Sequence, residues 1–142
     1  MAANANEADG SILVIGVGNE FRGDDGLGVH VARELRRRSS KEVRIVEQCG
    51  EGTSLMAIWD GAAHVLIIDA VISGEPPGTV HRLDATKQQV PKRFFNSSSH
   101  SFGVAEAIEM ARGLNQLPDT VVLYGIEADS FEPGVGLSGP VV

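Results

Sequence analysis

Three side chains whose chemistry suits a metal ion lie beside separate apolar segments of the chain. Asp25 lies near the end of a glycine-rich loop, Asp69 ends an apolar run, and His100 comes just before a segment with helical spacing. Two carboxylates and one imidazole suit a borderline divalent metal and leave some of its coordination positions open. A site of this kind performs Lewis-acid chemistry.

Each of these residues also has a simpler explanation when it is taken alone. Asp24 or Asp25 would cap the helix that begins near Gly26, although two adjacent aspartates exceed what one cap requires. Asp69 would be a hydrogen-bonded aspartate facing solvent at the end of a strand, and His100 would be a capping or surface residue. The combination of the three, rather than any single spacing, therefore predicts the metal site.

Two other kinds of site fit the sequence less well. The start Gly16-x-Gly18 resembles a dinucleotide-binding loop, but Phe21 occupies the position of the third glycine. The clustered carboxylates of the same loop, such as Glu20, would also repel a pyrophosphate. No GxSxG nucleophile motif is present, and Cys49 is interpreted as a packed thiol.

Length and composition limit the function classes further. The chain has 142 residues, with 42% hydrophobic and 22% charged residues, which predicts one ordered domain. Its net charge of −7 disfavours binding to nucleic acid or to an anionic membrane. One cysteine cannot form an internal disulfide, and neither a targeting segment nor a membrane span is recognised. We therefore expect a cytoplasmic location.

Strand-like and helix-like segments alternate along the chain. The predicted strands are 11–17, 43–46, 65–69, 79–83 (at an edge) and 120–126, and the predicted helices are 27–38, 53–59 and 102–114. This alternation predicts an α/β fold with a largely parallel sheet and helices on both faces. Ligands bind at the carboxyl ends of the strands in such sheets, where the three candidate ligands should converge. Residues 1–10 are expected to be a disordered tail and 87–101 a long surface loop.

The predicted helix 27–38 is amphipathic and ends in a basic run. Its apolar stripe consists of Leu27, Val31 and Leu35, with Gly28 and Ala32 beside it. The closing Arg36–Arg38 suits the negative end of the helix dipole. We interpret this run as a solvated helix end rather than a nucleic-acid patch.

Several motifs, in order and over nearly the whole chain from Ile12, resemble the [NiFe]-hydrogenase maturation endopeptidases. They are ILVIGVGNEFRGDDGLGVHVAREL at 12–35, GTSLM at 52–56, VLIIDAV at 65–71, SHSFG at 99–103 and LYGIEADSFEPGVGLS at 123–138. The resemblance implies a three-layer α/β/α sandwich of the phosphorylase/hydrolase-like type, with a twisted, mainly parallel five-stranded sheet. It also implies removal of a C-terminal extension from the precursor of the hydrogenase large subunit after nickel insertion.

The same resemblance implies which residues form the site. The family's acidic residue before the glycine of the first loop falls on Asp25, its strand-ending aspartate on Asp69, and the histidine that opens its later helix on His100. Nickel would arrive with the precursor, as a recognition signal or as the ion that polarises the scissile carbonyl or a bound water. Family members continue into a long C-terminal helix, which we expect the single peptidase domain 11–142 to lack. We also expect a monomer.

Two alternatives from other classes stay open at this point. One is a non-proteolytic binding module that senses the nickel-loaded precursor without cutting it. The other is a metal-dependent hydrolase that acts on a different small substrate, because a fold alone does not set a function. A metal held tightly by the isolated protein would indicate the hydrolase, whereas the endopeptidase should contain little resident metal.

Overall fold

The computed structural model describes residues 12–18, 26–38, 43–48, 52–71, 74–90 and 103–127. The elements along the chain are β1 (Ile12–Val17), α2 (Leu27–Arg38), β2 (Val43–Gln48), α3 (Gly52–Trp59), β3 (His64–Val71), β4 (Val80–Asp84), α4 (Val104–Gly113) and β5 (Thr120–Glu127). All eight coincide with predicted elements, and their bounds differ by two residues or fewer. The predicted tail 1–10 and residues 91–101 of the predicted surface loop lie outside the described residues.

The five strands form one sheet in the order β2-β1-β3-β5-β4. Strands β2, β1, β3 and β5 run parallel to one another, and β4 pairs antiparallel with β5 at one edge. This topology confirms the predicted α/β fold, its mainly parallel sheet and the edge position of the 79–83 segment. No helix within the described part of the chain is long and apolar enough to cross a membrane.

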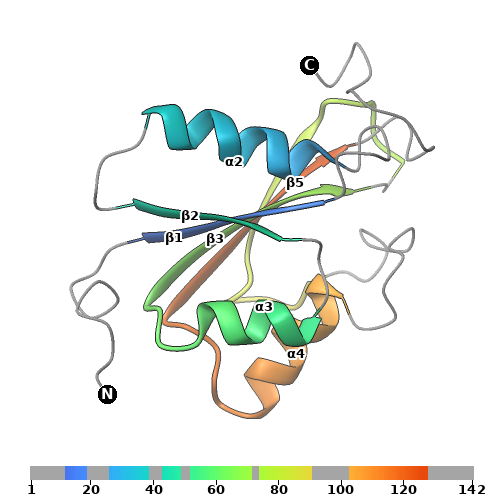
Figure 1. Cartoon of the computed structure of the whole chain (residues 1–142). Coiled ribbons are helices and arrows are strands. Elements are labelled where there is room, and N and C mark those ends of the chain that lie inside the picture. The colour runs from blue at the N-terminus through green and yellow to red at the C-terminus, as the bar shows by residue number, and fades with distance from the viewer. Residues whose placement is uncertain are drawn as a thin grey trace.

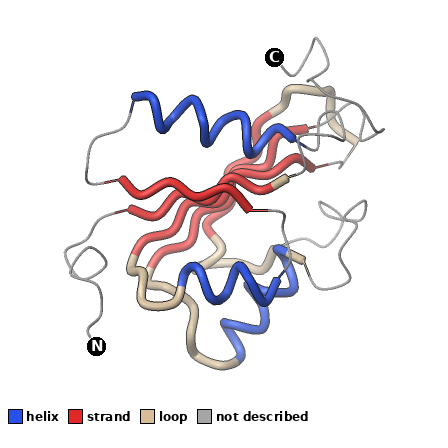
Figure 2. The backbone as a smooth tube through the Cα atoms, in the orientation of Figure 1, coloured by secondary structure: helices blue, strands red, loops and turns tan. Residues whose placement is uncertain are grey.

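Helices cover both faces of the sheet, which completes three layers (Figures 1 and 2). Helix α2 lies on one face, while α3 and α4 lie together on the other. Side chains alternate between the two faces along each strand. On the α3/α4 face they form the main core, with members Leu13, Ile15, Val65, Ile67, Val121, Leu123, Leu55, Trp59, Val104 and Ile108 among others.

The N-terminal turn of α2 lies unusually close to the sheet. A Cβ atom added at Gly16 would lie 2.3 Å from the carbonyl oxygen of Gly28 and 2.5 Å from Cβ of Ala32. A Cβ added at Gly28 would lie 2.2 Å from the Val17 carbonyl oxygen and 2.3 Å from that of Ile68. Real Cβ atoms do not approach other atoms this closely, so only glycine fits at either position.

This close approach changes which residues of α2 face the sheet. Val29 and Ala32 are buried together with Gly28, whereas Val31 and Leu35 are only half-buried. The predicted stripe of large residues is therefore wrong for Val31 and Leu35, since the contact is made by small residues that let the backbones meet. Gly28 and Ala32, which lie beside that stripe, make the contact with the sheet instead.

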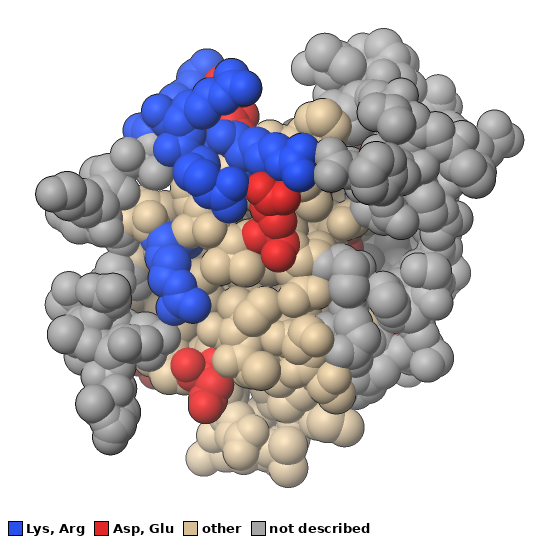
Figure 3. Space-filling model, viewed as in Figure 1, with Lys and Arg blue, Asp and Glu red and all other residues tan. Residues whose placement is uncertain are grey.

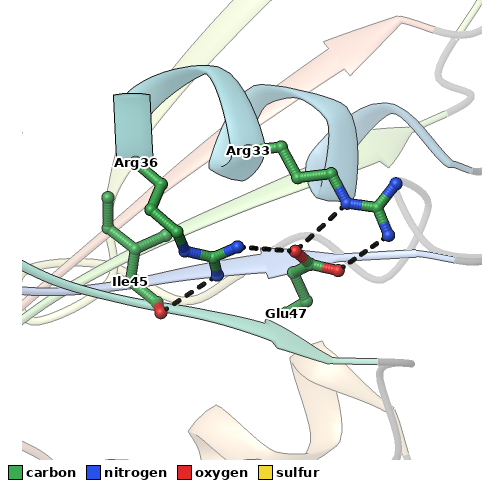
Figure 4. A network of polar contacts seen from close by, with 4 residues as sticks. All are labelled: Arg33, Arg36, Ile45 and Glu47. Carbon is green, nitrogen blue, oxygen red and sulfur yellow. Dashed lines mark hydrogen bonds and ion pairs between the residues drawn. The ribbon is translucent and has the colours of Figure 1, made fainter. Parts of the chain in front are cut away.

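An ion-pair network fastens the exposed side of α2 to the edge strand β2 (Figure 4). The Arg33 guanidinium donates to both carboxylate oxygens of Glu47 at 3.1 and 3.0 Å, and Arg36 Nη1 donates to Glu47 Oε2 at 2.9 Å. Arg36 Nη2 also donates to the Ile45 carbonyl oxygen at 3.2 Å. The hydrogen bonds and charge of Arg33, and then of Arg36, lower the pKa of Glu47 below its ordinary value.

The last two residues of α2 are basic and solvated, as the sequence predicts, whereas Arg36 of the same run binds Glu47. Arg37 and Arg38 are 78% and 76% exposed and pair with the half-exposed Glu34 one turn earlier. Figure 3 shows the basic side chains gathered on this face over α2 and β2, with acidic groups between them. Exposed pairs of this kind contribute little to stability.

The Gly28 contact leads to a first prediction. Gly28→Ala should lower the free energy of unfolding by roughly 1–3 kcal/mol or more, because the methyl group overlaps two carbonyl oxygens and α2 must move away from the sheet. Urea denaturation followed by circular dichroism measures this. Gly113→Ala is the matched control, because a Cβ there meets nothing within 4 Å. Equal midpoints for the two variants would contradict the proposed role of the contact.

The Glu47 network leads to a second prediction. Glu47→Gln should lower stability at neutral pH by roughly 0.5–1 kcal/mol, since the ion pairs are partly exposed. Because the pKa of Glu47 is lower in the folded state than its ordinary value of 4.5, the ionised carboxylate contributes its full stabilisation above pH 4.5. This contribution is lost as the pH falls through the lower pKa of the folded state. The difference between wild type and variant should thus vanish in acid. Unfolding curves at neutral and acidic pH test this, with Glu34→Gln as the control; a difference that persists in acid would refute it.

Candidate functional site

The topology creates a switch point at the carboxyl ends of β1 and β3. These strands are parallel neighbours, but β1 leads through α2 to β2 on one side, whereas β3 lies on the other side. Crevices at such points are where open α/β sheets bind their ligands. The glycine contact described above places the beginning of α2 at this edge, against the carbonyl oxygens of Val17 and Ile68.

Asp69 lies beside this switch point and is enclosed by the protein. Its side chain is 7% exposed, and its Oδ1 atom accepts a hydrogen bond of 2.8 Å from the N–H of Ala70. Strand alternation puts it on the same face as Val65 and Ile67, which is the face covered by α3 and α4. The interpretation of Asp69 as a solvent-facing aspartate is therefore wrong, because the side chain is buried.

The strand also continues beyond Asp69, which corrects its predicted end. Ala70 and Val71 pair with Ile126 and Glu127 of β5, so β3 runs to Val71. The carboxylate is consequently set back by two residues from the end of the strand. A carboxylate buried in this way needs hydrogen-bond donors or a cation, because desolvation of an unpaired charge costs several kcal/mol.

The other two predicted ligands, Asp25 and His100, lie outside the described residues, so the structure neither brings them to Asp69 nor separates them from it. Glu20, Phe21, Asp24 and Cys49 also lie outside these residues. Within the described ranges, no group of three or more His, Cys, Asp or Glu residues could hold a metal. The three-ligand site stays a prediction, and Asp69 is the one of its three ligands that lies among the described residues.

A second acidic residue at this edge was missed in the sequence. Glu127 ends β5 with a side chain only 1% exposed, and its Oε1 atom lies 2.9 Å from Nε2 of His81 on β4. Asp69 and Glu127 are the only buried charged side chains among the described residues. The signal was available, because Glu127, like Asp69, follows an apolar β-branched run, but the strand was expected to end at Ile126.

Comparison with known sequences identifies the family. A profile of the hydrogenase maturation protease family matches residues 29–142. The chain belongs to this family. It is 32% identical over 134 residues to the hydrogenase 2 maturation protease of Escherichia coli K12, and the match covers 92% of this chain and 80% of that protein. It is 33% identical over 132 residues to hydrogenase expression/formation protein HupD of Thiocapsa roseopersicina, of which it spans 58%.

Solved structures agree with this assignment. The solution structure of an endopeptidase from Escherichia coli has a TM-score of 0.79 and 31% identity, and the match covers 92% of this chain and 82% of the other. A [NiFe] hydrogenase maturation protease from Thermococcus kodakarensis has a TM-score of 0.70 at 22% identity, covering 98% and 87%, and shows the shared fold. Membership confirms the resemblance inferred from the sequence and places the chain in a class of proteolytic enzymes.

Proposed function

We propose that this chain is an endopeptidase that removes the C-terminal extension of a [NiFe]-hydrogenase large-subunit precursor after nickel insertion. In this proposal the precursor's nickel is bridged by Asp25, Asp69 and His100. The observation that carries it is the buried Asp69 carboxylate at the switch point of a hydrogenase maturation protease fold. The cytoplasmic location and the monomeric state expected from the sequence stay predictions.

Chain geometry supports Asp25 as a ligand that can reach Asp69. Gly28 packs against the carbonyl oxygen of Ile68, the residue directly before Asp69. Asp25 precedes Gly28 by three residues, so its Cα lies within about 11 Å of that of Gly28. The Gly28 contact thus holds the start of α2 against the strand that carries Asp69.

The start of α4 supports His100 in the same way. Helix α4 leads into the amino end of β5, so its own first turn lies toward the carboxyl edge of the sheet. The N–H of Gly103, just before the helix, donates to Glu106 Oε1 at 3.0 Å and ties down this turn. Val104 packs into the core on the same face as Asp69. His100 precedes Gly103 by three residues, within about 11 Å along the chain.

Two carboxylates and one imidazole suit the chemistry of this substrate. Nickel is a borderline metal that accepts imidazole and carboxylate ligands, and three ligands leave room for groups of the precursor. The ion would act as the signal that the precursor is loaded. It would also polarise the scissile carbonyl or a water, so that cleavage requires the metal.

Loss of a ligand should abolish processing without loss of the fold. Asp69→Asn keeps an oxygen that can accept from the Ala70 N–H but removes the charge that a metal requires. We expect at least a hundredfold loss of cleavage of nickel-loaded precursor, and the same for Asp25→Ala and His100→Ala. Mass spectrometry of the precursor, with and without inserted nickel, measures the loss of the C-terminal peptide.

Asp119→Asn is the matched control, because Asp119 is exposed next to Thr120 at the amino end of β5. It should process the precursor at the wild-type rate. Precursor that is bound by the wild type but left intact would instead indicate the non-proteolytic binding module. Nickel-independent cleavage, or normal cleavage by the three ligand variants, would overturn the proposed site.

A further inference from the structure

The buried carboxylate of Glu127 and the ring of His81 lie near Asp69 on the same face of the sheet. Leu123 and Leu83 face each other in the β4–β5 ladder and contact the α3/α4 core. Two residues farther along β5, and two residues back along the antiparallel β4, Gly125 and His81 form the next pair on this face. Gly125 also pairs with Asp69 of β3. Asp69, Gly125 and His81 therefore form one row across three strands.

Strand spacing sets the separations within this row. With neighbouring strands about 4.8 Å apart, the Cα atoms of Asp69 and His81 are about 10 Å apart, and both side chains rise from the same face. The residue between them, Gly125, has no side chain, and the space above it is filled by Val71, whose Cγ1 would lie 2.8 Å from an added Cβ. The apolar side chain of Val71 therefore lies over Gly125, between Asp69 and His81.

Glu127 holds the histidine in this row. Its backbone is bound to the segment before β4, because its N–H donates to the Thr79 carbonyl oxygen at 2.8 Å and its carbonyl oxygen accepts from the Gly78 N–H at 2.9 Å. Its buried Oε1 lies 2.9 Å from His81 Nε2. Nε2–H donates this bond when the carboxylate is ionised, because an ionised carboxylate can only accept. The carboxylate therefore sets the orientation of the ring, which is 24% exposed.

The pair differs from an ordinary link between strands. At the opposite end of the sheet, His64 Nδ1 lies 2.7 Å from the Thr120 hydroxyl, and this exposed contact joins β3 to β5. The link between β4 and β5 instead uses a carboxylate that is 1% exposed. Burial of a carboxylate costs free energy unless it is hydrogen-bonded or paired, so strand pairing alone does not require one here.

We propose that His81, oriented by Glu127, contacts the peptide of the precursor on the β4 side of Asp69 and so determines how tightly this substrate binds. The proposal rests on the proposed function, because it needs the precursor as substrate. His81 is a substrate-contacting residue in this scheme and Glu127 is a positioning residue that acts through it.

Steady-state cleavage of nickel-loaded precursor tests this proposal. His81→Ala should raise KM about tenfold or more and change kcat less than about threefold, because it removes a contact made equally in the ground and transition states. Glu127→Gln should also raise KM, but by a smaller factor, since the amide forms a weaker hydrogen bond with the ring. Thermal unfolding of each variant separates an effect on binding from an effect on folding.

His64→Ala is the matched control, because it removes a hydrogen-bonded histidine from the far end of the same sheet. It should lower the unfolding temperature without changing KM. If His81→Ala behaves like His64→Ala, or lowers kcat alone, the substrate contact is refuted while the proposed function stands. If the wild-type protein leaves the nickel-loaded precursor uncut, the proposed function fails and this inference fails with it.

Discussion

Backbone contact between Gly16 of β1 and Gly28 of α2 is the constraint on which the site depends. Because neither residue has a Cβ, the first turn of α2 rests directly on the carbonyl oxygens of Val17 and Ile68. This contact brings the start of α2 to the edge of the sheet where β1 and β3 diverge. A helix that side chains held farther from the sheet would not cover that edge.

Burial of charge is the second organising feature of this edge. The two buried acidic side chains among the described residues, Asp69 and Glu127, both lie on the α3/α4 face near the carboxyl ends of neighbouring strands. The rest of that face is apolar and forms the main core. Buried carboxylates destabilise a protein unless they are paired, so their concentration in one place indicates a site rather than a packing accident. The ion pairs of Glu47, by contrast, lie on the outer side of α2 and serve its attachment to β2.

Prediction from the sequence succeeded where local pattern decides structure and failed where neighbouring elements do. The apolar run at 65–69 predicted β3, but its last two residues are strand because β5 offers partners to Ala70 and Val71. The apolar stripe of α2 was assigned to large residues, whereas the structure buries Val29 and Ala32 because glycine brings the helix close. Asp69 was recognised as a candidate since a carboxylate interrupting an apolar run stands out in any sequence.

The sequence by itself determined the α/β class, the order of the elements and the family, because periodicity and motif spacing are local properties of the chain. It also singled out Asp25, Asp69 and His100 as candidate ligands by residue type and position. Only the tertiary structure decided that His81 and Glu127, 46 residues apart, meet beside Asp69. Their meeting depends on β5 inserting between β3 and β4 and on β4 running antiparallel to it. Such pairing is set by the packing of the whole sheet, and no local pattern in either strand records it.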